Sequence, residues 1–253
     1  SLGASLGTLR DVKIESMDEQ HEEFQKYHTI QSETVALGVV TVAWGSGFTN
    51  LFTTLGARSI VKGGQTMNPS CQDLLDAAIA SRSDTVILLP NNRNIVPTAH
   101  QAAELSEIPI KVLETTSIQQ GIAAILAFDQ DEDIGPNLDA MKRSISDVRS
   151  GEVVTAIRDS TVDGQFVEVG RIIGSIENKL VFIGSSPDEA VQAMIETVSP
   201  DEGSLVTLYW GGDMTDENSN ELADVLKNRS PSIEFEAVYG GQPYYHYLVS
   251  FEG

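Results

Sequence analysis

An alternation between short, wholly apolar runs and amphipathic segments of helical length constrains the first half of this chain more than any other feature. Leu37 to Ala43 (LGVVTVA) and Thr85 to Leu89 (TVILL) are continuous apolar runs, which is typical of strands buried on both faces. Cys71 to Ala80 instead places its leucines and alanines on one helical face. Strands that alternate with helices of this length predict a parallel sheet in a layered α/β lobe.

The same pattern places the other elements of this lobe, which we assign to residues 34–128. We expect strands at 37–43, 58–61, 85–89 and 110–113. Helices are expected at 48–55 and 71–80, and two further helices should end at residues 105 and 126. All four strands are expected to be parallel, because a helix connects each strand to the next.

From residue 151 the pattern changes to an α+β lobe that extends to residue 253. Asp163-Gly164 is a strong turn signal between the expected strands at 153–162 and 166–176, and it predicts an antiparallel hairpin. Residues 129–150 are expected to be a linker and a connecting helix near 133–149. Residues 1–33 are expected to be a tail that links to another domain of a longer protein, and the family resemblance described below implies that they are the end of a preceding, middle domain.

Charge and cysteine content exclude several classes of function. With 16 basic and 37 acidic residues, the net charge of −21 repels nucleic acids and anionic lipid surfaces. The single cysteine, Cys71, allows no internal disulfide and fits a reducing, cytoplasmic compartment. No run approaches 18 apolar residues, so we expect no membrane span.

Polar loops follow the predicted strands of the first lobe. Ligands of open α/β sheets bind outside the carboxyl ends of the strands, and the loops at 63–70, 90–94 and 114–121 are rich in amides and hydroxyls. The candidate ligand- or partner-binding residues are Thr66, Asn68, Ser70, Asn91, Asn92, Arg93, Asn94, Ser117, Gln119 and Gln242. Helix capping is an equally good explanation for Ser70 and Ser117.

We expect Thr66, Asn68, Asn92 and Arg93 to converge on one polar surface that faces the second lobe, with Gln242 closing it from the other side. Arg93 is the only strong cation in these loops. It should therefore hold an anionic ligand group or a carboxylate of the second lobe. The sequence does not decide whether this polar surface binds a ligand or holds the two lobes together.

Catalytic and metal-binding motifs are absent from the sequence. The four histidines are scattered and have no metal-ligand spacing with Cys71. Neither a P-loop nor a G-x-S-x-G elbow occurs, and GSGFTN is only a partial dinucleotide-binding motif. We therefore expect no catalytic residue and no metal site in this chain.

Several segments resemble the carboxyl-terminal region of the fatty acid kinase A subunit, which belongs to the dihydroxyacetone kinase-like group. The matching segments occur in order from about residue 34 to 252. They are GGQTMNPS…DLLDAA, VILLPNNRNI…AAELS, TTSIQQGIAAILAFD, GEVVTAIRDSTVDG and VYGGQPYYHYLVSFE. The resemblance implies a DegV-like fold, in which an acyl chain lies between two lobes and small hydroxyl and amide groups hold its carboxylate. Thr66 to Ser70 resembles the threonine- and proline-containing loop of those proteins.

The resemblance also implies a longer parent that phosphorylates a fatty acid presented by a DegV-like fatty-acid-binding protein. ATP and magnesium would bind only to the kinase domain of that parent, and no cofactor is expected in this fragment. Our first hypothesis is a non-catalytic regulatory and partner-docking module, with the DegV-like protein and its own kinase domain as partners. The alternative is a domain that binds a fatty acid or another small carboxylate in a cleft between the lobes. Homodimer formation is left open.

Overall fold

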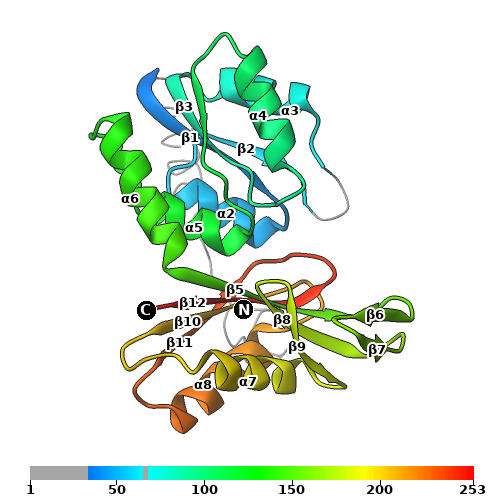
Figure 1. The fold of residues 1–253 in the computed structure, drawn as a ribbon. Coiled ribbons are helices and arrows are strands. Elements are labelled where there is room, and N and C mark those ends of the chain that lie inside the picture. Colours follow the sequence, from blue (N-terminus) through cyan, green and yellow to red (C-terminus); the bar gives the residue numbers. More distant parts are fainter. Residues whose placement is uncertain (1–33, 65–67) are drawn as a thin grey trace, which may run out of the picture. The chain divides into compact units, whose positions relative to one another are not determined.

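A computed structural model of the chain describes residues 34–64 and 68–253. Residues 35–253 form one compact unit, which contains two large sheets with their helices and a small two-stranded sheet (Figure 1). The tail expected at residues 1–33 lies outside the described residues. None of the described helices is long and apolar enough to cross a membrane.

The first sheet is four-stranded and entirely parallel, as predicted. It consists of β1 (Val35–Ala43), β2 (Ser59–Lys62), β3 (Ser83–Leu89) and β4 (Ile110–Val112), in the order β2-β1-β3-β4. The ladder between β1 and β3 pairs Val39 with Ile87, and both side chains are fully buried. The sheet is therefore covered on both faces, as its continuous apolar runs predicted.

Helices cover the two faces of this sheet (Figure 1). They are α2 (Ser46–Thr54), α3 (Cys71–Ala80), α4 (Val96–Leu105) and α5 (Ile118–Leu126), and α6 (Ile134–Ser146) packs beside α5. Alternate residues of β1 point to opposite faces, so Val40 packs with α3 and α4 while Val39 packs with α2 and α5. Ser70 begins α3 with the expected capping box to Asp73.

The second sheet is mixed and six-stranded. It consists of β5 (Val148–Thr155), β8 (Ile172–Ile176), β9 (Lys179–Gly184), β10 (Leu205–Trp210), β11 (Glu234–Tyr239) and β12 (Tyr245–Glu252), in the order β11-β10-β12-β5-β8-β9. Only β10 and β11 pair in parallel among these strands. Helices α7 (Pro187–Val198) and α8 (Asp216–Arg229) pack on one face of this sheet (Figure 1).

Two expected elements of the second half have different bounds in the structure. The connecting helix ends at Ser146, and Val148 is buried and pairs with Glu252 in the sheet, because its β-branched side chain fits the ladder better than an exposed helical turn. The predicted hairpin exists, with Asp163 and Gly164 at φ 48° and 80°. However, its strands are interrupted: β6 (Ser160–Val162) and β7 (Gln165–Val167) form a small separate sheet beyond β5 and β8.

Helix α5 packs against the two sheets. The buried Gln119 side-chain amide donates hydrogen bonds to the carbonyl oxygens of Gly151 (3.0 Å) and Val249 (3.2 Å) in the six-stranded sheet. Phe48 and Phe52 of α2 join the same hydrophobic cluster as Tyr209 and Leu248 of that sheet. Gln119 was predicted to bind a ligand or partner, but both of its observed bonds are internal.

Gly121 of α5 provides a test of this packing. A Cβ atom at Gly121 would lie 2.1 Å from Oδ1 of Asn91. Although alanine normally favours a helix, Gly121→Ala should destabilise the protein by about 1–3 kcal/mol because the buried turn must shift. Urea unfolding measures this change, and its size should shrink in an Asn91→Ala background because the contact is shared.

Gly135→Ala in α6 is the matched control, because a Cβ atom there meets nothing within 4 Å. We expect its effect to stay within about 0.5 kcal/mol. An equal effect of both substitutions would contradict the packing of α5 against Asn91.

Candidate functional site

Asn91, which we predicted to be a binding residue, fixes the ends of three strands from inside the protein. Its Nδ2 donates hydrogen bonds to Thr41 Oγ1 and to the carbonyl oxygen of Val42, both at 2.8 Å. Its Oδ1 accepts a hydrogen bond from Thr115 Oγ1 at 2.7 Å. The residue is 1% exposed and has a φ of 55°, a conformation that asparagine tolerates better than most residues. These bonds use the side-chain amide within the fold.

Beside this turn lies a polar hollow between the two sheets, which we call the polar crevice. Its volume is about 110 Å³. From the first sheet it is lined by Asn92, Arg93, Asn94, Thr116, Ser117 and Gln120, and from the second by Ser150, Glu152, Glu177 and Asn178. Ser117 Oγ lies 2.7 Å from Ser150 Oγ, so the two walls meet through a hydrogen bond. Ser117 Oγ also accepts from the Gln120 backbone N–H, as the predicted cap of α5.

Opposite charges face each other in the polar crevice. Burial raises the pKa of the Glu152 carboxyl, and the neighbouring Glu177 raises it further. Arg93 opposes this rise, so its guanidinium acts on a carboxylate of the second sheet. The described part of the chain contains no direct ion pair between Arg93 and Glu152, so the two roles expected for Arg93 from the sequence both stay predictions.

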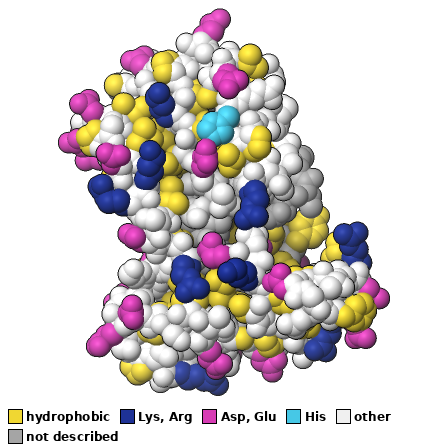
Figure 2. All heavy atoms as spheres, in the orientation of Figure 1, with side chains coloured by type: hydrophobic (Ala, Val, Ile, Leu, Met, Phe, Trp, Pro, Cys, Tyr) yellow, Lys and Arg dark blue, Asp and Glu magenta, His cyan; other side chains and the backbone are white. Residues whose placement is uncertain are grey.

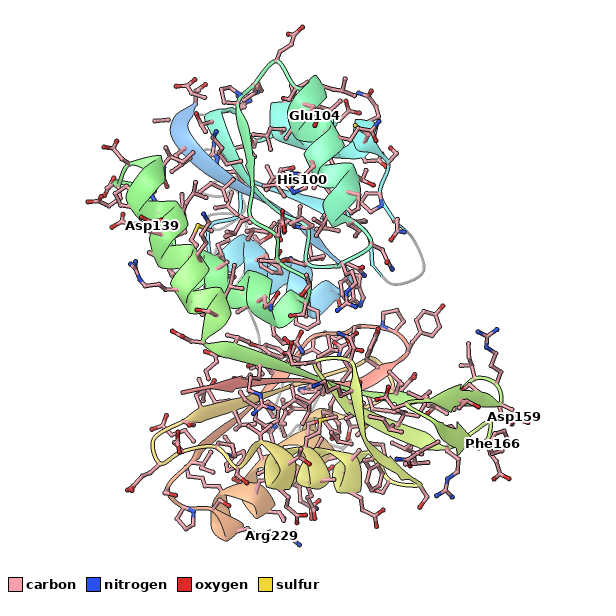
Figure 3. The ribbon with its side chains drawn as sticks, in the orientation of Figure 1. His100, Glu104, Asp139, Asp159, Phe166 and Arg229 are labelled. Carbon is pink, nitrogen blue, oxygen red and sulfur yellow. The ribbon has the colours of Figure 1, made fainter. Side chains whose placement is uncertain are left out.

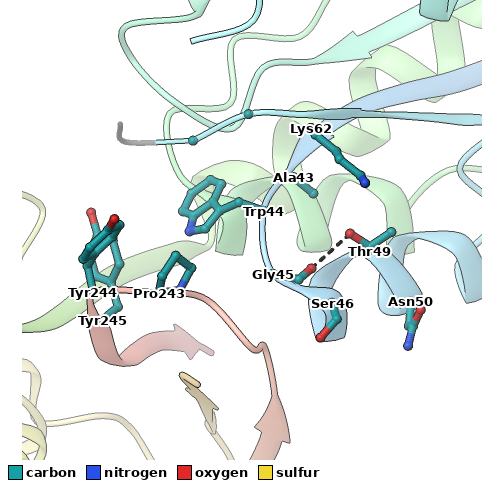
Figure 4. Close-up of a pocket in the computed structure, with 12 residues that line it drawn as sticks. Ala43, Trp44, Gly45, Ser46, Thr49, Asn50, Lys62, Pro243, Tyr244 and Tyr245 are labelled. Atoms are coloured by element: carbon teal, nitrogen blue, oxygen red, sulfur yellow. Dashed lines mark hydrogen bonds between the residues drawn. The ribbon is translucent and has the colours of Figure 1, made fainter. Parts of the chain in front are cut away.

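A second and larger hollow, which we call the aromatic pocket, lies at the carboxyl ends of β1 and β2 (Figure 4). Its volume is about 490 Å³. The first sheet with its adjoining loops and α2 contribute Ala43, Trp44, Gly45, Ser46, Thr49, Asn50, Lys62, Gly63 and Gly64. The loop before β12 contributes Pro243 and Tyr244, and β12 itself contributes Tyr245. Aromatic rings and a proline line the left side of the pocket in Figure 4, and Lys62 supplies a cation at the upper right.

Close backbone packing builds this pocket. A Cβ atom at Gly47 would lie 2.0 Å from the carbonyl oxygen of Tyr239, so only glycine allows the start of α2 to approach the loop after β11. There the Phe48 N–H donates to the carbonyl oxygen of Gly240 at 3.1 Å. A Cβ atom at Gly64 would lie 2.7 Å from the Trp44 ring. The glycines of WGSG and GGQTMNPS thus bring Trp44 and the loop before β12 together.

The expected polar surface forms only in part. Asn92 and Arg93 both line the polar crevice, but neither Asn68, which is exposed, nor Gln242 does. Thr66 lies outside the described residues. Gln242 belongs to the short loop between β11 and β12 and is fully buried, and its Nε2 donates to the carbonyl oxygen of Tyr209 at 2.8 Å. The loop turns the Gln242 side chain inward, which a sequence pattern cannot indicate.

Trp44, Lys62 and Tyr244 were not among the residues predicted to bind. Their signal was present in the sequence, because aromatic residues flank the glycines of WGSG and GGQPYY. The prediction favoured amide and hydroxyl groups instead, and these largely serve the fold.

The described histidines are far apart in the fold, as their scatter in the sequence suggested. His100 on α4 contacts Glu114, with Nε2 2.8 Å from Oε1 (Figure 3). His246 lies on β12, where its Nε2 is 2.7 Å from Thr155 Oγ1. Among the described residues, no cluster of three or more histidine, cysteine, aspartate or glutamate side chains could hold a metal ion.

The fold combines a parallel sheet that is covered by helices with a mixed sheet that has helices of its own. The chain shares this fold with solved DegV-family proteins. A Corynebacterium glutamicum DegV family protein superposes with a TM-score of 0.61 at 13% identity, over 86% of this chain and 96% of that one. The Streptococcus pneumoniae fatty acid kinase B3 protein, solved with linoleic acid, gives 0.60 at 10% identity, over 86% and 99%. At such identities the likeness concerns the fold alone.

The chain belongs to the FakA-like C-terminal family, named for the C-terminal region of the fatty acid kinase A subunit, and the family's model matches residues 38–252. An uncharacterized protein of Staphylococcus haemolyticus is 34% identical over 258 residues, which is 99% of this chain and 47% of that protein. Protein YloV of Bacillus subtilis is 34% identical over 252 residues, or 97% and 46%. The chain therefore spans about half the length of these relatives.

Glu152 should make the stability of the protein depend on pH in a defined direction. Its pKa is raised from 4.5 in the folded chain, so the folded state binds the proton more tightly than the unfolded state does. Stability contributed by the protonated carboxyl is therefore present below about pH 4.5 and is lost as the pH rises through the folded pKa. Glu152→Gln should match the parent at low pH and become the more stable protein above this window.

Thermal unfolding across this pH range measures the difference between the two proteins. Glu168→Gln, at an exposed position on the hairpin, is the matched control and should not reproduce it. If Glu152→Gln instead changed the melting temperature by the same amount at every pH, the raised pKa of Glu152 would have no role in the pH dependence of stability.

Proposed function

We propose that this chain is a non-catalytic regulatory and partner-docking module of a two-component fatty acid kinase. Its partners would be a DegV-like fatty-acid-binding protein and the kinase domain of its own full-length chain, where ATP and magnesium would bind. Family membership and relatives of about twice the length support this proposal. The observation that carries the docking role is the open aromatic pocket.

Tyr244 at the pocket rim has the features of a contact residue. Its side chain is 64% exposed, and its φ of 71° is unusual for an aromatic residue. The next residue, Tyr245, is buried against the core and anchors the loop. Tyrosine and tryptophan in such pockets supply much of the binding energy of protein interfaces. The pocket thus offers a preformed, partly apolar anchor site to a protein partner.

The space between the sheets favours docking over storage of a whole acyl chain. Phe48 of α2 packs against Tyr209 of β10 with ring centroids 5.4 Å apart. Phe52 and Leu248 are buried in the same cluster. These side chains occupy the layer between the two sheets, so the aromatic pocket lies at its margin.

A second candidate function is the binding of a fatty acid or another small carboxylate in the aromatic pocket. Its volume of about 490 Å³ lies within the usual range of ligand sites, about 300–1,000 Å³, which are mostly apolar with a few polar groups. Lys62 could pair with the carboxylate. Several DegV-family neighbours were solved with fatty acids, which gives this alternative a structural precedent.

Tyr244→Ala and Trp44→Ala test the docking role. If the pocket receives the partner, each substitution should weaken binding of a purified, fatty-acid-loaded DegV-like protein by at least about tenfold, equivalent to about 1.4 kcal/mol. Titration calorimetry with the full-length protein measures the affinity. Phe166→Ala is the matched control, because Phe166 is also 64% exposed but lies on the β6–β7 hairpin (Figure 3). Unchanged affinity in both pocket variants would exclude this docking site.

Native mass spectrometry separates the two candidate functions. The docking module should emerge from bacterial expression without a lipid, and it should neither hydrolyse ATP nor phosphorylate a fatty acid alone. A retained acyl ligand that is lost in Lys62→Gln would favour the carboxylate-binding alternative. Kinase activity of the isolated chain would contradict the non-catalytic assignment.

A further inference from the structure

The polar crevice carries charge of both signs on facing walls, unlike the aromatic pocket. Arg93 projects from the turn before α4, while Glu152 and Glu177 belong to β5 and the turn after β8. We propose that the polar crevice binds a small zwitterion, an α-amino acid with a short side chain. Its carboxylate lies toward Arg93 and its ammonium group toward Glu152 and Glu177.

The charged groups of the polar crevice are not neutralised by direct pairing within the described part of the chain. Arg93 is exposed and forms no ion pair with a described carboxylate. Glu152 is half-buried and lies close to a second carboxylate, that of Glu177. Glu177 uses Oε1 to accept the Ser150 backbone N–H at 2.6 Å, which leaves its other oxygen for a cation. A molecule with both charges separated by one carbon complements the two walls at once.

The size and polarity of the polar crevice restrict the ligand further. With a volume of about 110 Å³, the polar crevice is much smaller than the aromatic pocket of about 490 Å³. This difference favours a small polar ligand such as glycine, alanine or serine over an acyl chain or a nucleotide. Asn94, Thr116 and Asn178 line it with amides and a hydroxyl, which can complete the hydrogen bonds of an ammonium and a carboxylate group.

The ligand would bridge the two sheets, because its two charged ends contact opposite walls. Binding to the folded state alone raises stability by mass action, so saturating glycine or L-serine should raise the melting temperature. This consequence is independent of the docking role, since the aromatic pocket and the polar crevice share no lining residue.

Amide NMR titration of the chain with glycine and with L-serine in the millimolar range tests the proposal. We expect saturable shifts at Asn94, Ser117, Gly151 and Asn178. Acetate and methylamine, which each carry one of the two charges, should bind at least about tenfold more weakly. No saturable shift with either amino acid would overturn the proposal, as would equal affinity for acetate.

Two substitutions locate the binding in the polar crevice. Arg93→Gln and Glu152→Gln should each weaken amino-acid binding by at least about tenfold. The matched controls Arg158→Gln and Glu168→Gln, at exposed positions outside the crevice, should leave it unchanged. Arg93 is exposed, so its substitution tests binding in a folded protein. If Arg93→Gln lowers the melting temperature while the parent binds no amino acid, Arg93 only locks the sheets together and the proposal is wrong.

Discussion

The buried side-chain amide of Asn91 determines where α5 can lie, and the joining of the two sheets depends on that position. Asn91 connects the ends of β1 and β3 with Thr115, which stands just before α5. Only glycine at position 121 allows α5 to pass beside this amide. From α5, Gln119 then reaches the carbonyl oxygens of two strands of the second sheet. Because buried amides must find hydrogen-bond partners, this chain of contacts permits little change in register.

A consequence is that three of the amides expected to recognise a ligand, those of Asn91, Gln119 and Gln242, form hydrogen bonds within the fold instead. The two hollows share no lining residue and differ in chemistry. Aromatic rings and one lysine line the larger hollow, whereas opposite charges and hydroxyls line the smaller one. Acidic and basic side chains are interspersed on the face shown in Figure 2. Local geometry, and not the net charge of −21, sets the chemistry of each hollow.

Family and fold connect this chain to two kinds of protein. The chain belongs to the FakA-like C-terminal family, and it has the fold of DegV-family proteins solved with fatty acids. Identities of 10–13% to the solved DegV-family structures show that this fold tolerates almost complete replacement of its side chains. In this chain, Phe48 and Phe52 occupy the layer between the sheets. The function of this chain therefore depends on the residues that line its two hollows, because the fold alone does not specify a function.

The sequence by itself determined the elements of the fold and the direction of the first sheet. Continuous apolar runs and intervening helices required four parallel strands, because strands buried on both faces and joined by helices have few other arrangements. Asp163-Gly164 likewise specified its turn through local backbone preference. Only the tertiary structure decided that the side chains of Asn91, Gln119 and Gln242 point inward, and that Trp44, Tyr244 and Tyr245 line one pocket. These outcomes depend on contacts between residues 24 to about 200 positions apart. No local pattern encodes such contacts, since each arises from the fit of whole elements against one another.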